Sequence, residues 1–116
     1  MSGYEIPNLR FSLPAGGAVA RCRFVSVDEN GNGIQATAAT QVIGASMNLV
    51  TENEVKANER IVEIADGIVM VEAAGTITAG AAAYSDANGK VTGTGTVQAG
   101  VAITSAAAGE LVAVKI

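Results

Sequence analysis

The run with the most recognisable chemistry in this 116-residue chain is Asp28-Glu29-Asn30-Gly31-Asn32-Gly33. It matches the opening of an EF-hand calcium loop, in which oxygen-bearing side chains alternate along the chain. That loop needs a bidentate glutamate at its twelfth position to complete the shell of a hard cation, and the residue there is Ala39. Because Asn-Gly pairs tolerate positive φ, we interpret the run as a hairpin turn and predict no metal site.

Nucleophilic chemistry finds little support in the sequence. Cys22 is the only cysteine and the chain has no histidine, so Ser-His-Asp and Cys-His pairs cannot form. We interpret Cys22 as a small buried hydrophobe in a strand. Glu52, Glu54 and Glu59 lie in the most polar stretch, where solvated faces are the usual outcome. The sequence therefore predicts no catalytic residues and no enzymatic activity.

Two further patterns suggest ligands but lack the accompanying residues. Lys90 follows an Asn-Gly pair, where carrier domains display a modified lysine, but the usual acidic and apolar frame is missing, and we interpret it as solvated. Gly93, Gly95 and Gly100 could cradle a phosphate, but no Lys-Ser/Thr follows them. We predict no cofactor and no small-molecule substrate.

Composition indicates a single domain with a thin core. The chain is 49% apolar but has only two Tyr and two Phe, together with 14 Gly. Large rings bury far more area than alanine or valine, so we expect neighbouring subunits to contribute stability. The N-terminus lacks the pattern of a signal peptide, and no stretch has the length of a membrane span. We expect no membrane partner.

Charge is distributed unevenly along the chain, whose net value is −4. Residues 1–27 carry three Arg against one Glu, which gives +2, whereas residues 28–116 carry four basic and ten acidic side chains, which gives −6. Nucleic-acid binding needs a concentrated basic surface, so the acidic body argues against it.

Residues 1–14 are predicted to form an extended N-terminal arm, and residues 15–116 a single β domain. Pro7 and Pro14 fix their own φ and favour extended geometry in the residues before them. The arm carries the side chains that we predict to bind a partner or a sister subunit: Tyr4, Ile6, Leu9, Arg10 and Phe11.

The body has the short β-branched runs and turn signals of a compact small β-barrel or β-sandwich, so the predicted class is all-β. Residues 23–28 alternate as a strand does, and residues 112–116 are the clearest strand, with Val112, Val114 and Ile116 on one face. Asp66-Gly67 is suited to a type I′ hairpin turn between two apolar runs. Residues 51–58 begin with the spacing of a capping box and form either a short helix or a polar loop.

The chain also resembles itself. Residues 25–31 and 83–89 share Asp-x-Asn-Gly, and each is followed by small residues and a short apolar-glycine unit, at 42–45 and 98–102. We predict two related hairpin units, although small-residue composition can also produce such matches by chance.

The order of several segments, none specific alone, is similar to the capsid cement, or decoration, proteins of tailed phages. The segments that carry this resemblance run from residue 13 onward and are Leu13-Pro14-Ala15-Gly16-Gly17, Ile43-Gly44-Ala45, Ala65-Asp66-Gly67-Ile68-Val69, residues 77–84, Gly89-Lys90-Val91-Thr92, Gly100-Val101-Ala102, residues 106–110 and residues 112–116. Residues 46–60 are longer and more polar than the family pattern, which leaves the register of the central strands open.

The resemblance implies a homotrimer on the outer surface of an expanded phage head, with the protein made in the host cytoplasm. It implies that major capsid protein subunits are bridged and held against internal DNA pressure. The arm residues, with Arg10, Arg21 and Arg23 facing acidic groups on the shell, would then anchor the protein, or the arm would complete a neighbour's barrel. Another virion component, such as a tail or fibre β domain, is the alternative.

Overall fold

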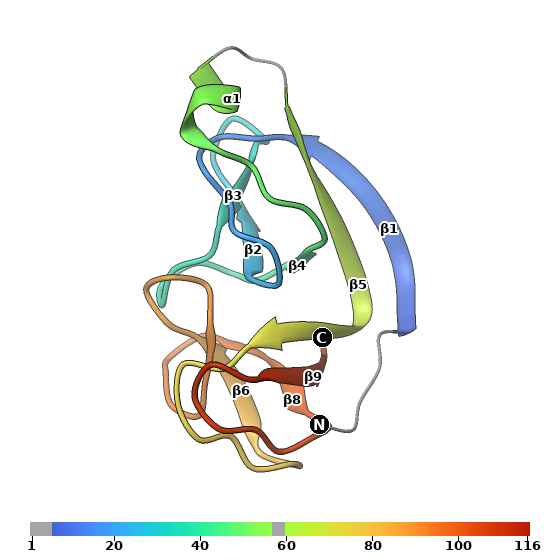
Figure 1. Ribbon diagram of the computed structural model, residues 1–116, viewed down its shortest axis with the longest axis vertical. Coiled ribbons are helices and arrows are strands. Elements are labelled where there is room, and N and C mark those ends of the chain that lie inside the picture. Colours follow the sequence, from blue (N-terminus) through green and yellow to red (C-terminus); the bar gives the residue numbers. More distant parts are fainter. Residues whose placement is uncertain (1–5, 57–59) are drawn as a thin grey trace.

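β5 is a twelve-residue strand, Ile61–Glu72, around which the rest of the chain is arranged. The computed structural model describes residues 6–56 and 60–116, which form nine strands and one short helix (Figure 1). The other elements are β1 (Ile6–Pro14), β2 (Phe24–Val27), β3 (Gly33–Gln35), β4 (Gly44–Ser46), α1 (Glu52–Lys56), β6 (Ala82–Ser85), β7 (Val91–Thr92), β8 (Gln98–Ala102) and β9 (Leu111–Lys115). The all-β prediction is confirmed.

The strands form one curled antiparallel sheet that makes a half-barrel. Its order is β3-β2-β4-β5-β9-β8-β6-β7, and β1 pairs with β5 outside this path. β1 runs beside β5 from the pair Ile6 and Ile68 to the pair Pro14 and Ile61, with an irregularity between Pro7 and Leu9. Figure 1 shows β1 lying along the outside of β5.

The hairpin turn predicted at Asp66-Gly67 is wrong. β5 continues through this pair and bends there, with Gly67 at a φ of 109° (Figure 1). The Gly67 N–H donates to Asp66 Oδ1 at 2.6 Å. The residues on either side do not pair with each other, because the first half of β5 pairs with β1 and β4 and the second half pairs with β9. Gly67 tolerates positive φ and therefore allows β5 to bend within one strand.

The predicted duplication is confirmed at its two matching turns. In the first, the N–H groups of Asn30 and Asn32 donate to Asp28 Oδ1, both at 2.9 Å. In the second, those of Asn88 and Lys90 donate to Asp86 Oδ1 at 2.8 and 2.9 Å. Gly31 and Gly89 have φ values of 81° and 75°. The aspartate thus caps the same turn twice, as expected for a hairpin turn.

The duplication extends to the pairing of the strands, which divide into repeat 1 (residues 6–66) and repeat 2 (residues 67–116). In repeat 1, β2 lies between β3 and β4, and β5 lies between β4 and β1. In repeat 2, β6 lies between β7 and β8, and β9 lies between β8 and the second half of β5. β5 therefore completes repeat 1 with its first half and begins repeat 2 with its second.

Two hydrophobic cores follow from this arrangement. Core 1 lies within repeat 1 and consists of Val19, Val25, Val50, Val62 and Ile64. The residues at the equivalent positions of repeat 2 all belong to a larger cluster, core 2, and are Ile77, Ala83, Ala106, Val112 and Val114. Most of these are smaller than their counterparts. Repeat 1 adds Phe24, Ala45 and Ala65 to core 2, so the repeats are joined by shared packing.

β2 contributes to both cores. Val25 belongs to core 1 and Phe24 to core 2, and both are fully buried. The strand predicted at residues 23–28 is therefore confirmed, but both of its faces are covered. At the C-terminus, Val112 and Val114 are buried in core 2, Ile116 packs against it, and Lys115 is exposed, as predicted for β9.

The open question at residues 51–58 is resolved as a helix over Glu52–Lys56. Thr51 and Glu54 form the capping box: the Glu54 N–H donates to Thr51 Oγ1, and the Thr51 N–H donates to Glu54 Oε1. The hydrogen bonds that the Thr51 N–H and hydroxyl donate to Glu54 Oε1 lower the pKa of Glu54. Val55 packs against core 1. The helix has no equivalent in repeat 2, where a short turn leads into β9, so it accounts for the greater length of residues 46–60.

Candidate functional site

Four of the five residues predicted to bind a partner lie on β1, which is hydrogen-bonded to β5 of the same chain. Leu9 and Arg10 are exposed, whereas Phe11 turns inward and packs against core 1. Ile6 is opposite Ile68 in the register, and Tyr4 lies outside the described residues. The structure thus places Leu9 and Arg10 on the surface and gives Phe11 a packing role. The division at residue 14 stays a prediction.

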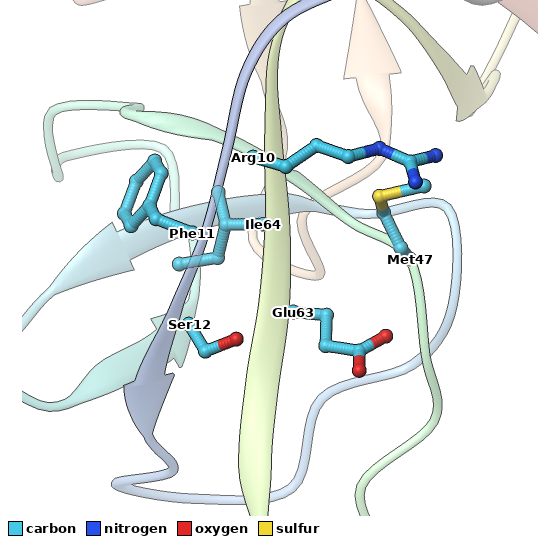
Figure 2. Close-up of a pocket in the computed structure, with 6 residues that line it drawn as sticks. All are labelled: Arg10, Phe11, Ser12, Met47, Glu63 and Ile64. Carbon is cyan, nitrogen blue, oxygen red and sulfur yellow. The ribbon is translucent and has the colours of Figure 1, made fainter.

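A hollow of about 260 Å³ lies beside β1 and β5. Its lining consists of Arg10, Phe11, Ser12, Met47, Glu63 and Ile64. Figure 2 shows the Arg10 side chain reaching across β5 toward Met47, with Glu63 nearby on the same side, whereas Phe11 and Ile64 point to the other side. A guanidinium, a thioether and a carboxylate therefore share this exposed side of the hollow.

Asn48 fixes the wall of this hollow opposite β1. Its Nδ2 donates to the Ile61 carbonyl at 3.1 Å, and its Oδ1 accepts from the Glu63 N–H at 2.9 Å. The Met47 N–H donates to the Glu63 carbonyl, also at 2.9 Å. Arg10 makes no ion pair with any described residue. These hydrogen bonds hold the backbone of Glu63, and its carboxylate together with the exposed guanidinium of Arg10 is suited to a polar partner surface.

A second cluster of charged groups lies where the two repeats meet. Glu72, at the end of β5, is 3.6 Å from Arg23 Nη2 and 2.9 Å from Lys90 Nζ. Arg23 Nη1 also donates to the Asn88 carbonyl at 3.1 Å, while its buried Nε has no partner among the described residues. The hydrogen bond from Lys90, followed by the charge of Arg23, lowers the pKa of Glu72.

The structure corrects three expectations about residues in or next to this cluster. Arg23 pairs within the chain and is not free to face acidic groups on a shell, whereas Arg21 is exposed. Lys90 is engaged by Glu72, so it is not simply solvated. Cys22 lies in a turn before β2, half-buried, with a φ of 59°. Its N–H donates to the Ser46 carbonyl and its carbonyl accepts from the Glu72 N–H, so backbone contacts to two strands hold it in that turn.

We expect the substitution Glu72→Gln to lower the free energy of unfolding by about 1 kcal/mol at pH 7, because it removes one shared partner of two cations. The folded-state pKa of Glu72 is lowered, so its contribution is present above its ordinary value and is lost as pH falls through the lowered folded value. The difference between variant and wild type should therefore shrink at pH 3 in urea denaturation. Glu29→Gln, at an exposed turn, is the control, and an unchanged difference at both pH values would contradict the role of Glu72.

Two features are absent from the residues that the structure describes. Nowhere in residues 6–56 or 60–116 do three or more His, Cys, Asp or Glu side chains gather in a way that could hold a metal ion. Within the same residues, no helix has the length and apolar character needed to cross a membrane.

The sequence profile of the phage cement proteins matches residues 5–116, which is nearly the whole chain. The chain belongs to the phage cement protein family. This membership supports a structural role on the phage head for this cement protein.

The fold of the cement protein is also similar to a solved structure, described as the head fiber gp8.5 N base in bacteriophage phi29. The TM-score is 0.71, the identity is 17%, and the similarity covers 91% of each chain. At this identity the likeness concerns the fold alone. The search of curated proteins finds no match.

Sequence reasoning missed Met47 and Glu63, which share the hollow with the predicted Arg10. They lie far from β1 along the chain and reach it through the pairing of β1 and β4 with β5. Local patterns do not specify such pairing. The internal repeat was the one usable signal. Its second half ends in β9, which pairs with the second half of β5 in the way that the first half of β5 pairs with β1.

Proposed function

We propose that this cement protein binds the outer surface of an expanded phage head as a homotrimer. It bridges major capsid protein subunits and so stabilises the shell against the pressure of packaged DNA. The observation that carries this proposal is the family match over residues 5–116. The role is mechanical and needs no catalysis, and the protein would be made in the host cytoplasm before it attaches.

The exposed edge of β1 gives this function a mechanism. β1 pairs with β5 on one side and with no other described strand along its length. An unpaired edge can accept an added strand from a partner, with main-chain hydrogen bonds giving affinity and alternate side chains giving specificity. Leu9 and Arg10 are exposed on this strand and the hollow lies beside it. We place the capsid contact here, although a sister subunit's arm could occupy the same edge.

Multivalency would strengthen such a contact. A trimer that engages several capsid subunits at once makes its second and third contacts intramolecular. This can raise the overall affinity by roughly 10²–10⁴-fold over that of one contact. Modest contacts at each β1 edge are then sufficient for stable attachment.

We expect the protein to co-sediment with expanded heads and not with unexpanded ones. Arg10→Glu should weaken binding by at least about tenfold, because it reverses a charge in the contact. Arg60→Glu is the matched control, because Arg60 lies outside the predicted arm and pairs with Glu54 within the chain. Point substitution is preferable to deletion of residues 1–12, which would remove most of β1 and the packing of Phe11. Equal binding by both variants would exclude the Arg10 surface, and no binding by wild type would contradict the proposed function.

A base for a head fibre is the second candidate, favoured by the structural neighbour. Electron microscopy of heads decorated with the full chain would distinguish the two roles. Compact knobs over the shell would support a cement protein. A role limited to a fibre base predicts fibres that project from the head when the remaining fibre components are present.

A further inference from the structure

Repeat 2 carries an apolar face that the described residues, 6–56 and 60–116, leave partly uncovered. Val101 of β8 is opposite Lys115 of β9, which is opposite Ile68 of β5, so these three side chains share one row and one face. Met70, two residues beyond Ile68, and Ile103, two beyond Val101, extend the same face. Val101 and Ile103 are 40% and 47% exposed and Lys115 is exposed, whereas Ile68 and Met70 are half-buried. We call these five residues the uncovered face.

The equivalent face of repeat 1 is buried. There the row runs from Ala45 of β4 to Ala65 of β5, in the same register as Val101 and Lys115. Ala45 and Ala65 are at most 1% exposed and belong to core 2 together with side chains of repeat 2. Met47, at the position of Ile103, packs against the same core. In repeat 1, therefore, this face is covered by another β repeat.

We propose that a second copy of this chain covers the uncovered face. The duplicated fold shows what this kind of face accepts, since its counterpart in the same chain is covered by a β repeat. The inference deepens the proposed function, on whose trimer it rests, by placing a subunit contact on β5, β8 and β9. The capsid contact is then left to the edge of β1.

Lys115 determines how the copies meet. It lies in the middle row of the uncovered face, between Val101 and Ile68. Two such faces packed against each other about a two-fold axis would bring two ammonium groups together, which is unfavourable. The face therefore contacts a different surface of the next copy. A heterologous contact of this kind closes into a ring when the rotation between copies is a whole fraction of a turn, and a rotation of one third of a turn gives the proposed trimer. The chain has a net charge of −4, so each copy offers carboxylates to Lys115.

The test is the native mass of the full chain and of three variants, measured by light scattering after gel filtration. We expect wild type to have about three times the 11.6 kDa mass of one chain. Val101→Asp should reduce the mass to that of one chain, because it places a carboxylate in the apolar contact. Lys115→Glu, at an exposed position where folding is not at risk, should do the same by removing the cation. Val27→Asp is the matched control, since Val27 is 42% exposed on β2 of repeat 1.

The outcomes separate this inference from the proposed function. A monomeric wild type overturns the inference, whether or not it binds heads. Oligomers that survive both Val101→Asp and Lys115→Glu also overturn it, and loss of head binding by those oligomers would assign the face to the capsid. Folded monomers, shown by circular dichroism, support it. A wild-type oligomer that dissociates as expected but ignores expanded heads supports the inference while contradicting the proposed function.

Discussion

The substitution Gly100→Ala is expected to lower the free energy of unfolding by about 3 kcal/mol or more. A Cβ at Gly100 would lie 2.9 Å from the carbonyl carbon of Lys115 and 3.1 Å from the Cα of Ile116, and it would overlap the Lys115 carbonyl oxygen. These are backbone atoms, so the clash cannot be relieved by a rotation of a side chain. β8 would have to move away from β9, where Val101 pairs with Lys115.

Gly44 occupies the equivalent position of repeat 1. A Cβ there would lie 2.6 Å from the Ala65 carbonyl oxygen. The close approach of β4 to β5 therefore repeats that of β8 to β9, and Gly44→Ala is expected to be similarly destabilising. The recurrence of glycine at both crossings indicates that the close approach belongs to the repeated unit.

Thermal denaturation measures the effect, since 1 kcal/mol shifts Tm by roughly 4–8 °C in a domain of this size. Gly100→Ala should lower Tm by about 10 °C or more. Gly93→Ala is the control, because nothing lies within 4 Å of a Cβ at that position, and it should change the stability by no more than about 0.5 kcal/mol. If Gly100→Ala and Gly93→Ala have the same Tm, β8 and β9 are not as close as they are in the structure.

The sequence predicted the features that depend on neighbouring residues. The prolines predicted an extended β1, the Asp-x-Asn-Gly pair predicted two capped turns, and the Thr51 to Glu54 spacing offered a helix as one of two outcomes. In each case the decisive hydrogen bonds or dihedral limits lie within a few residues. Short-range chemistry is readable because it has few competing arrangements.

The features that the sequence did not predict depend on distant partners. Asp66-Gly67 has the same local chemistry in a hairpin and in a bent strand, and only the pairing of Ile68 with Lys115 and of Ala65 with Ala45 excludes the hairpin. Burial is equally non-local. Ala45 and Val101 are equivalent apolar residues, but the first is covered by repeat 2 and the second is exposed. The candidate surfaces could therefore be located only after the strands had been paired.

Phe24 links the two repeats, and the substitution Phe24→Ala is expected to lower the free energy of unfolding by about 3–5 kcal/mol. Its side chain is 0% exposed and lies in core 2, whose members include small residues such as Ala83 and Ala106. Truncation would leave a cavity that these short side chains cannot fill. A domain of this size has roughly 5–15 kcal/mol of stability in total, so the loss would be a large part of it.

The backbone at Phe24 makes the same connection, which sharpens the expected result. Its N–H donates to the Gly89 carbonyl of repeat 2 at 2.7 Å, and its carbonyl accepts from the Ala36 N–H of repeat 1 at 2.8 Å. These bonds survive the substitution, so the loss measures the packing of the ring between the repeats. Phe11→Ala is the matched control: Phe11 is only half-buried, against core 1, and should cost clearly less. Urea denaturation of both variants, followed by circular dichroism, gives the comparison. Equal losses would mean that core 2 closes around the missing ring, and that shared packing at Phe24 is not what holds repeat 1 to repeat 2.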